Sequence, residues 1–163
     1  MKNFLVLAAL MLSPTALAEE AFQDWTVDRA GNVIAAQTVN ASGGTLLYAC
    51  YITEQKCVYA ISTGLSCEDG STYMSLVNSS GKGSALMLQC AADPEGDLMV
   101  FSDHDEAARA IDHASGIIGI AIPTDQATGS FHAFKFSMRG FTAASQRAAS
   151  LTQSAEKPRN STL

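Results

Sequence analysis

The sequence predicts a mainly β protein with one or two short helices, of the α+β class, folded as a single antiparallel β-sandwich-like domain. Three observations lead to this class. Runs of 5 to 8 residues rich in aromatic and β-branched side chains recur along the chain between polar or glycine-containing turns. All four cysteines lie within the stretch from Leu46 to Cys90. Helix signals are confined to residues 103–116 and 142–151.

The first 18 residues have the parts of a secretory signal peptide. Lys2 supplies the positive charge, an apolar run follows, and Ala16-Leu17-Ala18 is a small-residue cleavage signal. The apolar run stops at Ser13-Pro14, short of the roughly 20 residues that a membrane-spanning helix needs. We therefore expect a mature chain that begins at Glu19 and is located in the periplasm, outside the cell or at its surface. The alternative is that the segment stays uncleaved as an anchor.

Cleavage would remove 18 of 163 residues and leave 145, enough for one domain with a substantial core. We expect that domain to span residues 19–153, followed by a disordered tail at 154–163. Loss of Lys2 lowers the formal net charge by one, from −6 to −7. This charge argues against nucleic acid or an anionic membrane as partner and favours a cationic one.

The four cysteines are predicted to form disulfides, because export places them in an oxidising compartment. They are Cys50, Cys57, Cys67 and Cys90. Their spacing contains no Cys-x-x-Cys and no nearby histidine, which argues against zinc-ribbon and thioredoxin-type sites. Of the three possible pairings we favour Cys50 with Cys57 and Cys67 with Cys90. Each bridge is expected to stabilise the fold by about 2–4 kcal/mol.

The N-terminal half predicts strands at residues 22–29, 33–39, 45–52 and 57–61. Trp25 is expected to be a core anchor, with ligand stacking as the alternative. Residues 53–56 join the last two strands as a hairpin loop. If that loop sets the register, Cys50 faces Tyr59, and the favoured disulfide to Cys57 requires a distorted loop.

A second hairpin is predicted from strands 72–77 and 84–90 around the polar segment 78–83. Within it, Gly81-Lys82-Gly83-Ser84 resembles part of a phosphate-binding loop. The full Gly-x-x-x-x-Gly-Lys-[Ser/Thr] pattern is missing and no helix follows, so we interpret the segment as a flexible turn. Residues 93–96 predict another turn and 97–101 another strand.

The helix at 103–116 begins with a capping box of Asp103 and Glu106 and ends at Gly116. The helix face that carries Asp105 and Arg109 is predicted to be solvated, with an ion pair between these two residues at i, i+4 spacing.

A metal site of His104, Asp105 and His113 is not favoured, because the two histidines are separated by two and a half helical turns. Strands at 117–122 and 131–138 follow. In the second, His132 shares a face with Phe134 and Phe136 and is interpreted as a structural histidine at the core edge.

The sequence contains no coherent catalytic pattern. The chain has no Gly-x-Ser-x-Gly elbow, and the paired acids stand in turns or at the helix start, where structure explains them. We therefore predict no catalytic residue, no cofactor and no metal.

Four segments together resemble the invasion-associated locus B family of exported bacterial proteins. Residues 22–27 (Phe-Gln-Asp-Trp-Thr-Val) and 136–144 (Phe-Ser-Met-Arg-Gly-Phe-Thr-Ala-Ala) are similar to its opening and closing signatures, and residues 50–55 and 88–90 to its cysteine-bearing segments. The resemblance implies a periplasmic or surface-associated β-sandwich-like protein, linked with host interaction in some members and without an established catalytic site.

The leading hypothesis is a non-enzymatic cell-envelope domain that binds a protein or an envelope ligand. The alternative is a secreted inhibitor of a lysozyme or protease, which the acidic charge would suit. A third hypothesis is a small hydrolase that uses His132 with an acid. A concave surface with Tyr48, Tyr51, Tyr59 or Tyr73 clustered beside acids would favour binding, and a closed surface would favour a protein partner. The sequence names neither the ligand nor an oligomeric state.

Overall fold

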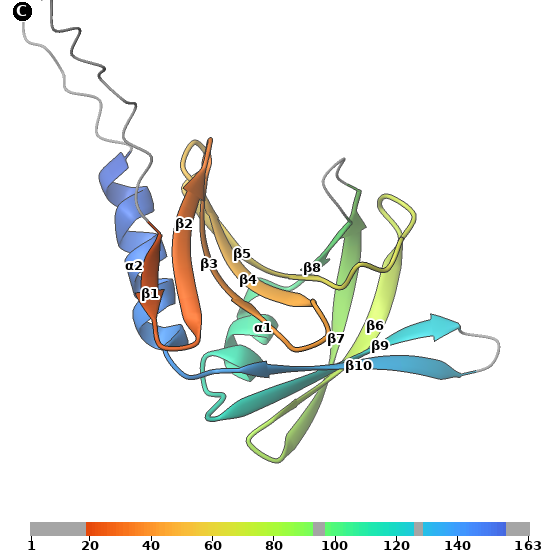
Figure 1. The fold of residues 1–163 in the computed structure, drawn as a ribbon. Coiled ribbons are helices and arrows are strands. Elements are labelled where there is room, and N and C mark those ends of the chain that lie inside the picture. The colour runs from red at the N-terminus through yellow and green to blue at the C-terminus, as the bar shows by residue number, and fades with distance from the viewer. Residues whose placement is uncertain (1–18, 93–96, 126–128, 156–163) are drawn as a thin grey trace, which may run out of the picture.

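One antiparallel sheet of ten strands carries the described chain, and two helices pack against it (Figure 1). This structure, a computed structural model, describes residues 19–92, 97–125 and 129–155. The predicted mainly β, single-domain antiparallel class is confirmed. The predicted signal peptide at 1–18 and the predicted turn at 93–96 lie outside the described residues.

The twelve elements follow one another mostly through short connections. They are β1 (Glu20–Phe22), β2 (Trp25–Ala30), β3 (Val33–Val39), β4 (Thr45–Tyr51), β5 (Lys56–Ser62), β6 (Thr72–Ser79), β7 (Lys82–Ala91), β8 (Leu98–Phe101), α1 (His104–Ile111), β9 (Ile117–Asp125), β10 (Ser130–Ser137) and α2 (Phe141–Ala155).

The strand order is β1-β2-β3-β4-β5-β8-β7-β6-β9-β10. The first five strands are successive neighbours, and β8 then lies between β5 and β7. Beyond β8, the later strand of the β6–β7 hairpin comes first, so that β7 pairs with β8. The earlier strand, β6, then pairs with β9. The order therefore depends on which distant strands pair, and only part of it follows the chain.

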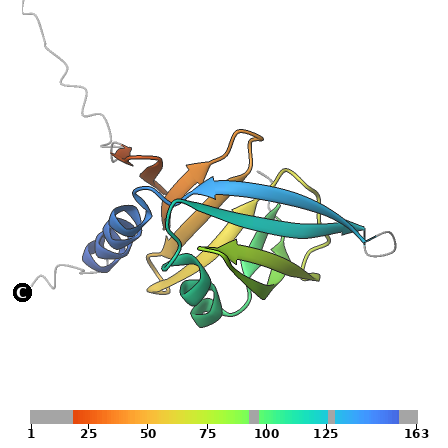
Figure 2. The ribbon, with the colours of Figure 1, turned by 90° about the horizontal axis from the view of Figure 1, so that it is seen from below.

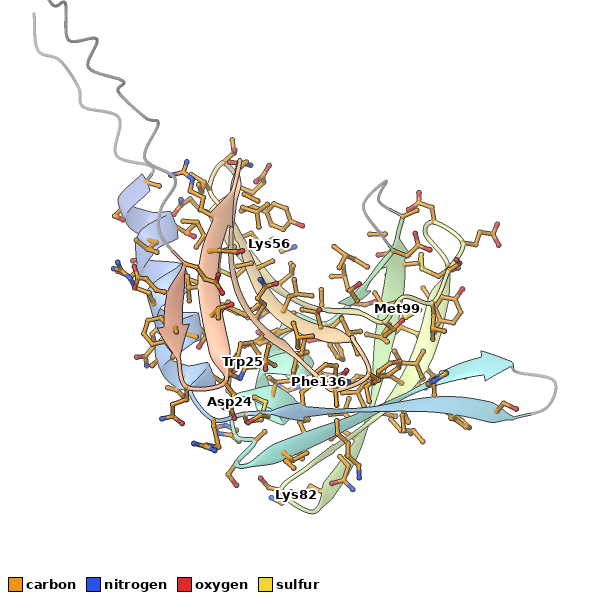
Figure 3. All side chains as sticks on the ribbon, in the orientation of Figure 1. Asp24, Trp25, Lys56, Lys82, Met99 and Phe136 are labelled. Carbon is orange, nitrogen blue, oxygen red and sulfur yellow. A yellow bond between two sulfur atoms is a disulfide. The ribbon has the colours of Figure 1, made fainter. Side chains whose placement is uncertain are left out.

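The sheet curls so that the end of β10 comes back to β2 and β3 (Figure 2). The buried core residues lie inside this curl. Trp25 of β2 donates its indole N–H to the backbone oxygen of Ser137, the last residue of β10, at 2.8 Å. Trp25 and Phe136 are both almost completely buried and point into the interior (Figure 3). The predicted core role of Trp25 is thus what the structure shows.

Each helix covers a different part of the inner face. α2 packs against β1, β2, β3 and β4, with the ring of Phe141 4.8 Å from that of Trp25. α1 packs against β5, β6 and β7 and buries Ala107 and Ile111. Neither helix has the length and apolar character that crossing a membrane requires, among the residues described.

The predicted cap of α1 is present, whereas its predicted ion pair is not. The Asp103 side chain accepts the backbone N–H of Glu106 at 2.9 Å. The helix ends at Ile111, well before the predicted Gly116. Asp105 contacts His104 at 3.5 Å, and Arg109 has no ion-pair partner within the described ranges. The prediction of an Asp105–Arg109 pair was therefore wrong.

Two predicted strand boundaries are also wrong, and left-handed residues explain both. The strand predicted at 22–29 is two strands, because Gln23 has φ 57° and turns the chain between β1 and β2. In the β4–β5 hairpin, the loop lies at residues 52–55, one residue earlier than predicted, with φ 50° at Gln55. Cys50 therefore faces Cys57 directly, and the predicted mismatch with Tyr59 does not arise.

The polar segment at 78–83 is almost entirely strand. β6 and β7 pair up to Ser79 and Lys82, so only Ser80 and Gly81 turn, both with positive φ (51° and 77°). Such a two-residue turn matches the twist of a hairpin, which allows the strands to continue to its end. At the C-terminus, α2 continues to Ala155, two residues into the predicted tail. Residues 156–163 lie outside the described part.

Candidate functional site

The four predicted site residues form two disulfides, in the pairing favoured from the sequence. Cys50–Cys57 joins directly opposed residues of β4 and β5, and Cys67–Cys90 ties the segment after β5 to β7. Cys67 and Cys90 lie close to the carboxylate of Asp97, which accepts the Cys67 N–H at 2.7 Å. Because both sulfurs are bonded to each other, neither is a thiolate that could bind a metal. The bridges are structural, and they fit a protein that folds outside the cytoplasm.

The histidines considered for chemistry lie apart from the acids that would activate them. His132 is exposed and stacks on Phe134 at a ring distance of 5.4 Å. Among the described residues, no hydrogen bond or ion pair joins His132 to an acid. His104 instead contacts Asp105 and the ring of Tyr59. The arrangement that a histidine-dependent hydrolase needs is therefore not assembled around His132.

Two tyrosines meet an acid in a cleft between the helices. Tyr59 donates its hydroxyl to Asp112 Oδ1 at 2.7 Å, and its ring lies 5.0 Å from that of Tyr48. The cleft has a volume of about 260 Å³, and Ser145 and Gln146 of α2 line its other side. Burial, followed by the hydrogen bond to Asp112, raises the pKa of Tyr59 far above its ordinary value. Its hydroxyl therefore stays protonated and acts as a donor.

The other two tyrosines do not join this cleft. Tyr51 follows Cys50 on β4 and points to the opposite face of the sheet. Tyr73 accepts a hydrogen bond from Ser71 near the second disulfide. Of the four tyrosines considered from the sequence, only Tyr48 and Tyr59 therefore lie together. The Tyr59 hydroxyl already donates its hydrogen bond to Asp112. We regard the cleft as a packing feature with a small polar opening.

The outer face of β7, β6, β9 and β10 is apolar, although it faces solvent. A row of side chains crosses all four strands: Leu76 lies between Ala85 and Ala121, and Ala121 faces Ala133. Leu76, the large side chain in this row, is 51% exposed. Large exposed apolar residues flank this row, namely Met74 at 48%, Met87 at 39% and Phe131 at 53%.

A groove of about 510 Å³ runs along this apolar face. Its floor is low because Gly83, Gly119 and the alanines of the row carry little or no side chain. Lys135 stands at its edge as a positive charge. The same face of the sheet is polar further along, where Asp28 of β2 accepts a hydrogen bond from Gln37 of β3. The apolar character is thus local, and such a patch typically marks an interaction surface.

Sequence reasoning missed this face, although a signal for it was present. In β6 and β7, apolar side chains occur at consecutive positions and therefore on both faces of the strands. β9 begins with the apolar run Ile117-Ile118-Gly119-Ile120-Ala121-Ile122. A strand that is apolar on both sides indicates burial on both faces. Because the curled sheet covers only the inner face, the outer apolar residues are left in solvent.

The two segments that resemble family signatures pack against each other. Phe141 lies on Trp25, and the Trp25 indole reaches Ser137. Ser137 Oγ also donates to Asp24 Oδ2 at 2.6 Å, while the Asp24 N–H donates to the Arg139 backbone oxygen at 3.3 Å. Residues more than 110 positions apart thereby form one joint, which closes the curl of the sheet. Their role is structural.

Comparison with known proteins identifies a similar fold among solved structures. No family model and no curated protein matches the sequence. Among solved structures, invasion associated protein b from Bartonella henselae is similar with a TM-score of 0.58, over 83% of this chain and 99% of that chain, at 10% sequence identity. This likeness shows that the two chains share a fold.

Proposed function

We propose that this chain belongs to the invasion-associated locus B family and works in the periplasm or at the cell surface as a non-catalytic domain that binds a partner protein. Two independent lines support family membership. The sequence has segments that resemble the family signatures, and those segments meet in a single joint of a fold shared with invasion associated protein b.

The observation that carries the binding role is the exposed apolar face around Leu76. An antiparallel sheet with one solvated face normally places polar side chains there. This face instead presents Leu76, Met74, Met87 and Phe131 around a groove. The occupant we propose is a protein segment with apolar side chains and a carboxylate, because the charge at the groove edge is that of Lys135.

The inhibitor of a lysozyme or protease is the alternative function, and the acidic net charge is its support. It is tested by adding the mature chain to such enzymes at micromolar concentration, where an undiminished rate removes it.

The binding proposal is tested with a charge placed on the apolar face. Labelled mature protein is titrated onto cultured host cells and onto envelopes of the producing bacterium, with excess unlabelled protein as competitor. Leu76→Asp is expected to weaken saturable binding at least about tenfold, since it places a desolvated charge in an apolar contact. Thr72→Asp is the matched control, because Thr72 lies on the same strand and the same face but outside the groove.

Three results would overturn the proposal. The first is equal binding of the Leu76→Asp variant and wild type. The second is binding that survives protease treatment of the cells or envelopes, which would exclude a protein partner. The third is Leu76-dependent self-association in sedimentation, which would assign the face to a second copy. Turnover of envelope polymers or esters by the purified chain would refute the non-catalytic part.

A further inference from the structure

A second cavity lies on the opposite side of the β6–β7 hairpin, between the hairpin and α1. Its volume is about 490 Å³, which is within the range of small-molecule sites. The hairpin contributes Ser79, Lys82 and Ser84, and α1 with the turn after it contributes Glu106, Arg109 and His113. None of these residues belongs to the apolar row on the other face, and only Ser84 among them also lines the groove there.

The geometry of both elements directs these side chains into the cavity. On the hairpin, the two-residue turn sets Lys82 opposite Ser79, and Ser84 opposite Val77, on the inner side of the strands. On α1, Glu106 and Arg109 are three residues apart, and His113 follows four residues later. The i, i+3 spacing brings Glu106 and Arg109 to one side of the helix, and His113, two residues beyond the end of α1, lines the same cavity.

A hydrogen-bonded contact at Ser80 sets the spacing between hairpin and helix. Ser80 Oγ donates to the backbone oxygen of His113 at 3.4 Å and accepts the N–H of Ser115 at 3.3 Å. Ser80 Oγ and Ser115 Oγ are also 3.3 Å apart. The turn that carries Lys82 is therefore attached to the segment that follows Arg109, so the two cations are held on facing walls.

The two cations are not used by the fold. Lys82 and Arg109 are exposed and form no ion pair with any residue that the structure describes. Glu106 is the acid among the lining residues, so the cavity has an excess of positive charge in a chain whose net charge is −6. Hydroxyls and two unpaired cations around one cavity are the donors that recognise an oxyanion.

We propose that this cavity binds a phosphate group, carried on a sugar or free in solution. Lys82 approaches the phosphate from the hairpin and Arg109 from the helix, while Ser79 and Ser84 supply neutral donors. A tetrahedral oxyanion accepts donors from several directions, which suits walls that face each other. The partial Gly-Lys-Gly-Ser pattern contributes through the placement of Lys82 and Ser84, without a nucleotide-binding loop.

The test is calorimetric titration of the mature protein at low ionic strength with three probes. Inorganic phosphate and glucosamine 6-phosphate are both expected to bind saturably with one site per chain. The third probe, the neutral sugar N-acetylglucosamine, is not expected to bind. Tighter binding of the sugar phosphate assigns the remaining volume to the sugar, and equal binding assigns the site to the free ion. Either result supports the phosphate site.

Three variants locate the binding. Lys82→Gln and Arg109→Gln are each expected to weaken phosphate binding about five- to tenfold. Glu106→Gln is expected to strengthen it about threefold, because it removes the opposing charge. The control is Lys56→Gln, which makes the same charge change on an exposed lysine at the opposite end of the molecule (Figure 3).

The proposal is overturned if neither phosphate probe binds saturably, if the neutral sugar binds as tightly as its phosphate, or if Lys56→Gln weakens binding as much as Lys82→Gln. The last result would show that the overall charge of the protein, and not Lys82 in this cavity, determines the phosphate affinity. The melting temperature of each variant shows whether it is folded. Leu76 does not line the cavity, so Leu76→Asp tests the protein-binding face separately, although Ser84 and Ala85 line both sites.

Discussion

Replacing Gly140 by alanine is expected to loosen the joint between the N-terminal strands and α2. Gly140 has φ 92°, and a Cβ built there would lie 1.8 Å from the backbone oxygen of Phe22. No rotamer can relieve this contact, because both atoms belong to or adjoin the backbone. The β1–β2 turn and the start of α2 must therefore move apart.

The cost follows from two contributions. A left-handed backbone costs an alanine about 1–2 kcal/mol. The displacement also strains the hydrogen bonds at Asp24, one to the Arg139 oxygen and one from Ser137 Oγ. Each is worth about 1 kcal/mol. The sum is about 3–4 kcal/mol, which corresponds to a drop in melting temperature of about 10 °C for a domain of this size.

The matched control is Gly43→Ala. Gly43 has φ 83° but no atom within 4 Å of an added Cβ, so this variant has the backbone cost without the clash. Urea denaturation of both variants should show Gly140→Ala to be less stable than Gly43→Ala by about 2 kcal/mol. Equal stability of the two variants would refute the argument that the close approach to Phe22 matters.

Two further predictions concern the disulfides and one ion pair. Replacing Cys67 and Cys90 by alanine should destabilise more than replacing Cys50 and Cys57, by about 1 kcal/mol, because the closed loops differ in length, with separations of 23 and 7 residues. Equal losses in urea denaturation would contradict this chain-entropy reasoning. Arg147 hydrogen-bonds the carboxylate of Glu20 at 2.6 Å and holds its pKa below the ordinary 4.5. The stability from this pair is present above that ordinary pKa and is lost as the pH falls through the lowered one. Glu20→Gln should therefore be less stable than wild type at neutral pH and equal to it in strong acid, and a difference that persists in acid would count against the pair.

Local patterns were enough to predict the fold class, the α1 cap and the cysteine pairing. The Asp103 cap depends on the chain within three residues, and it is present as predicted. The register of β4 and β5 was wrong by two residues, because the four-residue loop starts at Ile52, one residue earlier than predicted, and Gln55 adopts a left-handed conformation. Moving the loop by one residue moves the ends of both strands, so Cys50 lies opposite Cys57 and not opposite Tyr59, as the predicted loop had placed it.

Neither candidate site could be assembled from the sequence. The apolar face requires the pairing of β6 with β9, and Leu76 and Ala121 are 45 positions apart. The phosphate cavity requires the hairpin turn to lie against α1, which Ser80 and His113 accomplish by a hydrogen bond between residues 33 positions apart. The Gly81–Ser84 segment could be recognised as unusual, but Arg109 could not be placed beside it.

By itself, the sequence determined that the chain is built from short strands with two helices and that no familiar catalytic motif is present. These properties depend on residue types and spacings within a few positions of each other. Only the tertiary structure decided the strand order, the joint between Trp25 and Ser137, the exposure of Leu76 and the meeting of Lys82 with Arg109. The physical reason is that each of these depends on how far the sheet curls and which distant strands pair, which no local pattern specifies.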